Sequence, residues 1–292
     1  MGLVDVDQTS RRAFYNPIEA HFIEANYWDR VHSIAPNWIL AAIYGMNDHM
    51  FNPYAHMDGP AQSYVDVRPS YPQQIIERLG LNPGAKVLDI GAGTGKLTQM
   101  LCDTGADVWA VEPAHEMRIA FQCALGDFPT EQLREASAED TGLPASSFDM
   151  VTYGQCWHWL NGEQALREAL RILRPEGKIA IINNQLDVSV PWVHRLTRIM
   201  RSGDVHRFDR PPELSSDFTQ PEFFSCTWED HLTIEQIFEL GTTRASWIRS
   251  TQENRRKMRS NLAWYLREHL GYDDGVPIVL PYHTYLWVAE RR

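Results

Sequence analysis

The feature that most limits the fold of this chain is an alternation of short apolar runs with longer amphipathic segments between residues 86 and 182. The strand-like runs are Lys86 to Ile90, Val108 to Glu112, a short run before Ser137, Phe148 to Tyr153 and Lys178 to Ile182. Helical periodicity occupies residues 96–102, 114–125 and 163–173 between them. Strands that alternate with helices imply parallel strands joined by crossover helices. We therefore predict a doubly wound α/β fold.

The segments outside this alternation are expected to add to the sheet or to cover it. Residues 1–62 are rich in aromatic residues and histidine and predict a helical extension or lid, with the best helix at 38–50. The main domain is then 63–292, and 184–220, which contains three prolines, predicts an insertion over the active site. Late strands at 223–231 and 276–289 predict an antiparallel edge hairpin, which makes the sheet mostly parallel and seven-stranded.

Composition excludes several classes of protein. The formal net charge of -11 opposes general attraction to nucleic acid. No apolar run approaches the length of a membrane span and no signal-peptide pattern is present, so we expect a cytoplasmic protein that does not bind membranes. The 4 cysteines lie apart without a CxxC pair and the 11 histidines show no helical HxxxH pair, so no metal site is expected. Basic residues are frequent from Arg195 to Arg259, and we interpret them as solvated helix faces rather than an anion site.

The loop VLDIGAGTGKLT, residues 87–98, contains three glycines at alternate positions directly after a predicted strand. Glycine lets the backbone take unusual dihedral angles and lets a ligand approach closely, and the N-terminus of the helix that follows offers N–H donors. The spacing G-x-G-x-G differs from both the dinucleotide and the phosphate-loop motifs. The loop alone therefore indicates a ligand site without naming the ligand.

Glu112 ends the next predicted strand, 21 positions beyond Gly91. A carboxylate at that place can accept hydrogen bonds from both hydroxyls of a ribose, and it excludes a 2′-phosphate. The residues therefore leave two ligands open, NAD and S-adenosylmethionine.

Several motifs in order make residues 64–180 resemble a class I S-adenosylmethionine-dependent methyltransferase of the small-molecule type, which includes the ubiquinone and trans-aconitate enzymes. The motifs are YVDVRPSYP, VLDIGAGTGKLT, VWAVEP, ASAEDTGLPASSFDMV, YGQCWHWL and ALREALRILRPEGKIAI. The resemblance implies a Rossmann-like fold, S-adenosylmethionine as cofactor and a small-molecule methyl acceptor. It leaves two rivals, a non-catalytic module that binds the same cofactor and, with less support, an NAD-dependent oxidoreductase.

The resemblance also implies which residues hold the methionine end of the donor. The amino acid part would lie on Asp89 and on the backbone of Gly91, Ala92, Gly93 and Gly95. Arg68 would lie near the donor carboxylate, Gln155 beside the sulfonium, and Tyr64 and Tyr71 at the border of the pocket. Each residue also has a plainer interpretation: Asp89 would suit a helix cap, and Gln155 would suit a loop whose backbone needs a partner.

At the adenosine end, the resemblance implies that Glu112 binds the ribose and that Pro113 and Met117 border the adenine. The Ala138 amide would meet a ring nitrogen. Ser137 stands where the family often has Asp, so the contact to the adenine amino group is expected to be weaker or to come from Glu139. The plainer interpretation of Met117 is an ordinary core residue at helical spacing.

His158 in CWHWL is the candidate general base, because this segment leaves the fourth strand beside the methyl-donating end. Packing at the strand end is the competing interpretation of His158, and Trp157 and Trp159 divide in the same way between pocket wall and core. No Asn-Pro-Pro-Tyr or Asp-Pro-Pro-Tyr tetrad follows the fourth strand, so an oxygen or carbon acceptor is favoured over nitrogen. The aromatic residues of the N-terminal extension suit either an apolar acceptor or a homodimer contact.

Overall fold

The structure is a computed structural model, and it describes residues 67–202 and 207–292. All of these residues belong to the compact unit Phe51–Arg292. The predicted helix at 38–50, the rest of the extension 1–62 and Tyr64 lie outside the described residues. The predictions made for them therefore stay predictions.

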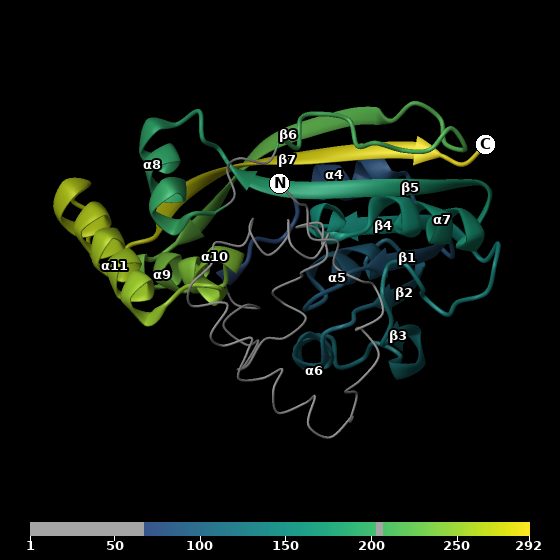
Figure 1. The fold of residues 1–292 in the computed structure, drawn as a ribbon, viewed down its shortest axis with the longest axis horizontal. Coiled ribbons are helices and arrows are strands. Elements are labelled where there is room, and N and C mark those ends of the chain that lie inside the picture. Colours follow the sequence, from purple (N-terminus) through teal and green to yellow (C-terminus); the bar gives the residue numbers. More distant parts are fainter. Residues whose placement is uncertain (1–66, 203–206) are drawn as a thin grey trace, which may run out of the picture. The chain divides into compact units, whose positions relative to one another are not determined.

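The described residues form a seven-stranded sheet in the order β3-β2-β1-β4-β5-β7-β6 (Figure 1). Strands β1 to β5 pair in parallel, and β7 runs antiparallel to both of its neighbours, β5 and β6. The strands are β1 (Lys86–Ile90), β2 (Asp107–Val111), β3 (Leu133–Arg134), β4 (Phe148–Gly154), β5 (Leu173–Leu186), β6 (Glu222–Leu232) and β7 (Ile278–Glu290). The doubly wound, mostly parallel sheet with an antiparallel edge is confirmed.

Helices cover both faces of this sheet, which explains why its strands are apolar at consecutive positions. Val87 packs on one face with α4 and α5, whereas Leu88 packs on the other face with α7. Successive side chains of a strand point to opposite faces, so a strand between two helical layers needs apolar residues at both parities. The helices of the sheet region are α4 (Gln73–Leu79), α5 (Lys96–Cys102), α6 (His115–Ala124), η3 (Thr130–Gln132), η4 (Trp157–Trp159) and α7 (Gly162–Ile172).

A separate group of helices packs around the C-terminal ends of β5 and β6 and the N-terminal end of β7. These helices are shown in green to yellow at one end of the sheet in Figure 1. These helices are α8 (Pro191–Met200), α9 (Ile234–Thr242), α10 (Ala245–Ile248), α11 (Gln252–Ala263) and the π-helical turn η5 (Trp264–His269). They share a buried cluster that includes Leu196, Ile237 and Leu262. α9 begins at a capping box, because Thr233 accepts from Gln236 N while the Gln236 side chain accepts from Thr233 N.

Strand β5 differs most from its prediction. It was predicted to cover Lys178–Ile182 after a turn at residues 175–177, but it runs from Leu173 to Leu186 with an irregular stretch inside it. Leu173 pairs with Phe148 and Lys178 pairs with Met150, so the residues between them bulge out, with Glu176 at a φ of 63°. At the other end, the start of the predicted insertion at 184–186 is strand, because β7 pairs with these polar residues. Tertiary pairing therefore determined the ends of β5.

Candidate active site

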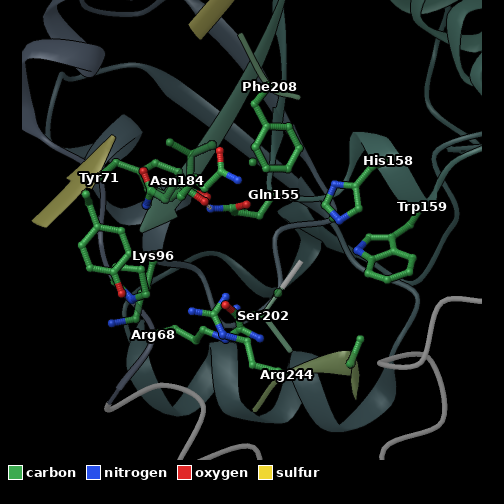
Figure 2. Close-up of a pocket in the computed structure, with 18 of the residues that line it drawn as sticks. Arg68, Tyr71, Lys96, Gln155, His158, Trp159, Asn184, Ser202, Phe208 and Arg244 are labelled. Atoms are coloured by element: carbon green, nitrogen blue, oxygen red, sulfur yellow. Dashed lines mark hydrogen bonds between the residues drawn. The ribbon is translucent and has the colours of Figure 1, made fainter. Parts of the chain in front are cut away.

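The site lies where β1, β4 and β5 end, at the point where the chain order reverses between β1 and β4. Ligands of open α/β sheets bind outside the carboxyl ends of the strands at such a point. A cavity of about 250 Å³ opens here (Figure 2). Its lining includes Arg68, Tyr71, Asp89, Gly91, Ala92, Gly93, Lys96, Gln155, His158, Trp159, Asn184, Arg201, Phe208, Arg244 and Tyr282.

The glycine loop connects β1 to α5 through backbone that other residues rarely adopt. Gly91, Gly93 and Gly95 have φ values of 67°, 57° and 86°. A Cβ atom at Gly91 would lie 2.9 Å from both Cβ and Sγ of Cys156. The amides of Gly91 and Ala92 both donate to the Val111 carbonyl, which ties the loop to the end of β2. The loop is therefore a close-fitting cradle of backbone beside the cavity.

We expect Gly91→Ala to destabilise the protein by about 1 to 3 kcal/mol, because the new methyl group meets Cys156 and the positive φ is strained for alanine. Urea unfolding measures this loss. Gly162→Ala is the matched control, since a Cβ there meets nothing within 4 Å at the start of α7. Equal stability of the two variants would show that the Gly91 backbone tolerates a side chain.

Glu112 follows β2 and is 6% exposed. Its Oε2 accepts a hydrogen bond of 2.9 Å from the Gly93 amide, and its Oε1 accepts one of 2.8 Å from the Ala114 amide. Burial raises the pKa of Glu112, and the two amide hydrogen bonds oppose that effect. The acid predicted to face a ribose thus lies against the glycine loop, and it holds that loop to the second strand.

Asp89 lies on β1 and is 1% exposed. Its Oδ2 accepts from the Thr98 hydroxyl at 2.7 Å, and its Oδ1 accepts from the Thr152 hydroxyl at 3.0 Å. Asp89 therefore joins α5 and β4 through hydroxyl groups. The helix cap that the sequence also allowed for Asp89 is wrong, because the N-cap residue of α5 is Gly95 and no side chain caps the helix there. Burial raises the pKa of Asp89 to about 7, and the two hydroxyl donors only partly oppose this shift.

This raised pKa has a consequence for stability. Folded Asp89 keeps a proton between its ordinary pKa of 3.8 and about 7, whereas the unfolded chain releases it, so the free energy of unfolding falls as pH rises through this range. We expect Asp89→Asn to lack this decrease. Relative to the wild type, the variant should gain on the order of 2 kcal/mol between pH 5 and pH 8 in urea unfolding. A constant difference between the two proteins across that range would contradict the raised pKa.

The cavity brings together eight of the predicted site residues, and six others lie outside its lining. Those that line it are Arg68, Tyr71, Asp89, Gly91, Ala92, Gly93, Gln155 and His158. Those that do not are Gly95, Glu112, Pro113, Met117, Ala138 and Glu139. Apart from Gly95, the division follows the predicted halves of the donor, because the lining residues are those predicted near its methionine end and the others are those predicted for its adenosine end. The cavity is smaller than the roughly 300 to 1,000 Å³ of typical ligand sites, which agrees with its covering one part of the site.

The residues of the adenosine end have partners within the protein. Met117 is buried on α6, and Pro113 is exposed before that helix. Ser137 Oγ accepts from the amides of Glu139 and Asp140, and Glu139 Oε1 accepts from the Asn161 amide at 3.1 Å. The Glu139 side chain therefore fixes the segment that precedes α7.

The segment GQCWHWL divides between cavity and core. Trp157 packs edge to face on buried Tyr153, with ring centroids 5.0 Å apart, whereas Trp159 lines the cavity. His158 also lines the cavity, and its ring lies 4.7 Å from the Trp159 ring and 5.7 Å from that of Phe208. His158 thus lies where a ligand can reach it, as a general base requires. Its ring also packs against other aromatic rings, as the competing packing interpretation predicts.

Gln155 turns the chain out of β4 at a φ of 61°, and its Nε2 donates to the Asn184 carbonyl at 2.9 Å. This bond gives a backbone carbonyl its hydrogen-bond donor, which is the plainer interpretation that the sequence allowed for Gln155. Asn184 in turn donates to the Ser70 carbonyl at 2.7 Å and accepts from the Thr284 hydroxyl at 2.6 Å. The sulfonium end of the predicted pocket is therefore braced by β5 and β7.

Sequence reasoning missed several residues of the lining, among them Asn184, Arg244 and Tyr282. Arg244 belongs to the basic segment that was interpreted as solvated helix faces, and for this residue that interpretation is wrong, because it is half-buried in the cavity. Tyr282 lies in the last strand, about 190 residues after the glycine loop. The sequence signals for these positions were weak: Asn184 falls in the predicted insertion, Tyr282 in a predicted strand, and Arg244 in a segment rich in arginine.

The fold and the glycine cradle define an α/β protein with a ligand site at the switch point of its sheet. The family model described as "Methyltransferase domain" matches residues 88–181. The chain is 35% identical over 223 residues to an uncharacterized methyltransferase of Mycobacterium tuberculosis, covering 76% of this chain and 90% of the relative. It is 34% identical over 209 residues to an uncharacterized methyltransferase of Schizosaccharomyces pombe, covering 68% and 82%. The chain belongs to the class I S-adenosylmethionine-dependent methyltransferases, and it is a methyltransferase.

More distant comparisons agree with this family. Malonyl-[acyl-carrier protein] O-methyltransferase of Geobacter sulfurreducens is 25% identical over 237 residues, covering 74% of this chain and 88% of the relative. A solved structure from Anaeromyxobacter dehalogenans, provisionally assigned as a type II methyltransferase, matches with a TM-score of 0.54 at 23% identity, covering 77% of this chain and 97% of that chain. That likeness concerns the fold alone.

Two further observations apply to residues 67–202 and 207–292. No group of three or more His, Cys, Asp or Glu side chains in this part of the chain is arranged to hold a metal ion. No helix in the same part is long and apolar enough to span a bilayer.

Proposed function

We propose that the chain transfers a methyl group from S-adenosylmethionine, bound at the glycine loop, to a small organic acceptor, and that S-adenosylhomocysteine is released. The observation that carries this proposal is the contact between the Gly93 amide and Glu112 Oε2 at 2.9 Å. This hydrogen bond joins the glycine loop after β1 to Glu112 after β2, the acid expected to bind the ribose. The loop and the acid therefore belong to one site. Membership of the methyltransferase family supports this donor over NAD.

The residues present fit the donor. Side-chain-free backbone at Gly91 and Gly93 leaves room for the methionine part, and Arg68 supplies a cation for its carboxylate. Glu112 would accept from the ribose hydroxyls, while Pro113, Met117, Ala138 and Glu139 would surround the adenine. When bound, the donor supplies a methyl group on a cationic sulfur, which is already a good leaving group. The protein then has to orient the acceptor and exclude water.

His158 is the residue we propose for removing a proton from the acceptor. It lines the same cavity as Gln155 and the glycine loop, and its ring is held by Trp159 and Phe208. A positioned base accelerates attack by a hydroxyl or an activated carbon. We favour oxygen or carbon as the methylated atom, and the similarity to the Geobacter protein, which is named an O-methyltransferase, supports oxygen. The covering roles of residues 1–62 and 184–220, a homodimer through the extension and a cytoplasmic location stay part of the proposal.

The test is transfer of tritium from methyl-labelled S-adenosylmethionine into a protein-free metabolite extract of the organism that makes the protein. We expect labelled product that depends on the protein and is suppressed by S-adenosylhomocysteine. Calorimetric titration with S-adenosylhomocysteine alone would not separate an enzyme from a binding module, so both measurements are needed. Binding of S-adenosylhomocysteine without any labelled product would favour the non-catalytic module.

A further inference from the structure

A second hollow lies beside the candidate active site, between α8 and α11. These two helices pack against each other at the end of the sheet drawn in green to yellow in Figure 1. The groove between them has a volume of about 640 Å³, which lies within the range of roughly 300 to 1,000 Å³ that is typical of ligand sites. Its lining includes Arg195, Arg198, Arg201 and Lys257, and none of the described residues that line it is acidic.

The two helices that form this groove carry an excess of positive charge. Their single acid is Glu253, which pairs with Lys257 at 2.6 Å. The arginine and lysine residues of α8, its last cap position and α11 are Arg195, Arg198, Arg201, Arg255, Arg256, Lys257 and Arg259. The sequence alone favoured solvated helix faces for this segment. Their convergence on one groove, in a chain of net charge -11, favours an anion site instead.

Three arginines of the groove follow one another along α8. Arg195, Arg198 and Arg201 are exposed and lie three positions apart, so they span about 9 Å of the helix axis. The side chains of Arg198 and Arg201 make no hydrogen bond or ion pair with any described residue. The Arg195 guanidinium lies over the Tyr265 ring, 5.4 Å from its centroid, and this contact does not use its N–H donors. All three guanidinium groups can therefore donate to a ligand.

The groove lies directly beside the candidate active site. Arg201 and Ser246 line both the groove and the cavity. The Ser246 hydroxyl donates to the Met200 carbonyl at 3.0 Å, which ties the start of α10 to the end of α8. Arg201 has a φ of 49° and ends α8 at this place. A ligand that extends past these two residues would occupy the groove and the cavity at once.

The chemistry of the groove suits a phosphate monoester better than a carboxylate. A phosphate monoester carries a charge of about -1.5 to -2 at neutral pH and has three strong acceptor oxygens, so several guanidinium groups can bind it together. A carboxylate has two oxygens, which the fork of one arginine already satisfies. Ile199 and Met258 also line the groove and pack on the apolar cluster beneath it, so they offer contacts for the uncharged part of a ligand.

We propose that the methyl acceptor is a small phosphate monoester, and that Arg195, Arg198 and Arg201 bind its phosphate in the groove between α8 and α11 while the atom to be methylated lies in the cavity. This inference rests on the proposed methyl transfer and specifies the acceptor class for that same site. The three arginines position the acceptor and do not take part in the chemical step.

The first experiment treats the protein-free metabolite extract with alkaline phosphatase, removes the phosphatase by filtration, and adds enzyme and tritiated donor. We expect the treated extract to lose most of its acceptor activity. With untreated extract, Arg198→Gln should raise the amount needed for half-maximal labelling by about 10- to 100-fold, with a much smaller effect on the maximal rate. Arg256→Gln removes the same charge from an exposed position of α11 outside the groove lining and should match the wild type.

The second experiment tests the groove without methyl transfer. Calorimetric titration with phenyl phosphate at low ionic strength should give tighter binding than titration with benzoate. Arg198→Gln and Arg201→Gln should each weaken the binding of phenyl phosphate by about tenfold, whereas Arg256→Gln should not. Arg198 is exposed and its side chain has no partner among the described residues, so its variant should fold.

The outcomes separate this inference from the function on which it rests. Acceptor activity that survives complete phosphatase treatment, or that requires the proteins or nucleic acids of a whole extract, would overturn the small phosphate monoester and leave methyl transfer standing. Equal effects of Arg198→Gln and Arg256→Gln would show that only overall charge matters and would overturn the groove. Label in neither extract, although S-adenosylhomocysteine binds, would overturn the proposed function and with it the acceptor class.

Discussion

Replacing His158 with alanine is expected to lower the turnover number for methyl transfer by about 100-fold, because the acceptor loses the group that takes its proton. His158 lines the cavity, and its ring is held against Trp159 and Phe208, so its position suits this role. The measurement is the initial rate of tritium transfer at saturating donor. Donor affinity should change little, since the residues proposed to hold the donor are left intact.

Two variants separate proton removal from packing at this position. His158→Phe keeps an aromatic ring beside Trp159 and Phe208 but cannot accept a proton, so it should be as slow as the alanine variant. His115→Ala removes an exposed histidine on α6 and should retain the wild-type rate. A full rate in His158→Phe would show that the imidazole serves packing and that the acceptor's nucleophile needs no base, as would be true of a carboxylate oxygen.

Replacing Glu112 with alanine is expected to weaken binding of S-adenosylhomocysteine by about 1 to 3 kcal/mol, roughly 5- to 150-fold, which is typical of losing a charge-assisted pair of hydrogen bonds. The same change leaves the Gly93 and Ala114 amides without their carboxylate partner, so the glycine loop also loses its tie to β2. Calorimetric titration measures the affinity, and urea unfolding records the effect on the loop separately.

Glu112→Gln is the informative companion, because it keeps an acceptor oxygen for one amide and removes the charge. It should bind more weakly than the wild type and more tightly than the alanine variant. Glu131→Ala removes an exposed acid from η3 and should bind as the wild type does. Wild-type affinity in a folded Glu112→Ala protein would show that the acid is a structural residue of the loop.

The parallel strands with their crossover helices and the position of the glycine loop could be predicted because they depend on local patterns. Strands β1, β2 and β4 are short runs with mostly apolar residues, and the crossover helix α7 has an apolar stripe with buried Ala165, Ala169 and Ile172. The loop signal is also local, since three positive φ angles within five residues require glycine. Glu112 could be placed beside the loop because neighbouring parallel strands end at the same edge of a sheet.

The part of the site that contains Asn184, Arg244 and Tyr282 could not be predicted in this way. Asn184 and Tyr282 lie on strands whose pairing joins residues about 100 positions apart, and polar residues there predict an irregular loop as readily as a strand. Arg244 lies at a helix boundary in a segment rich in arginine, and nothing local distinguishes it from its exposed neighbours. Its place in the cavity depends on Arg68 and the Thr243 carbonyl, 175 positions apart in the chain.

The amino-acid sequence by itself determined the α/β layering, the glycine cradle and the acid beside it, because hydrophobic period and backbone conformation act over a few residues. Only the tertiary structure decided that a chain of net charge -11 gathers arginines at one cavity, and that Tyr282 of the last strand lies beside them. The physical reason is that charge and hydrogen bonding act through space. The net charge and the hydrogen-bond partners at a site therefore depend on which distant segments of the chain the fold brings together.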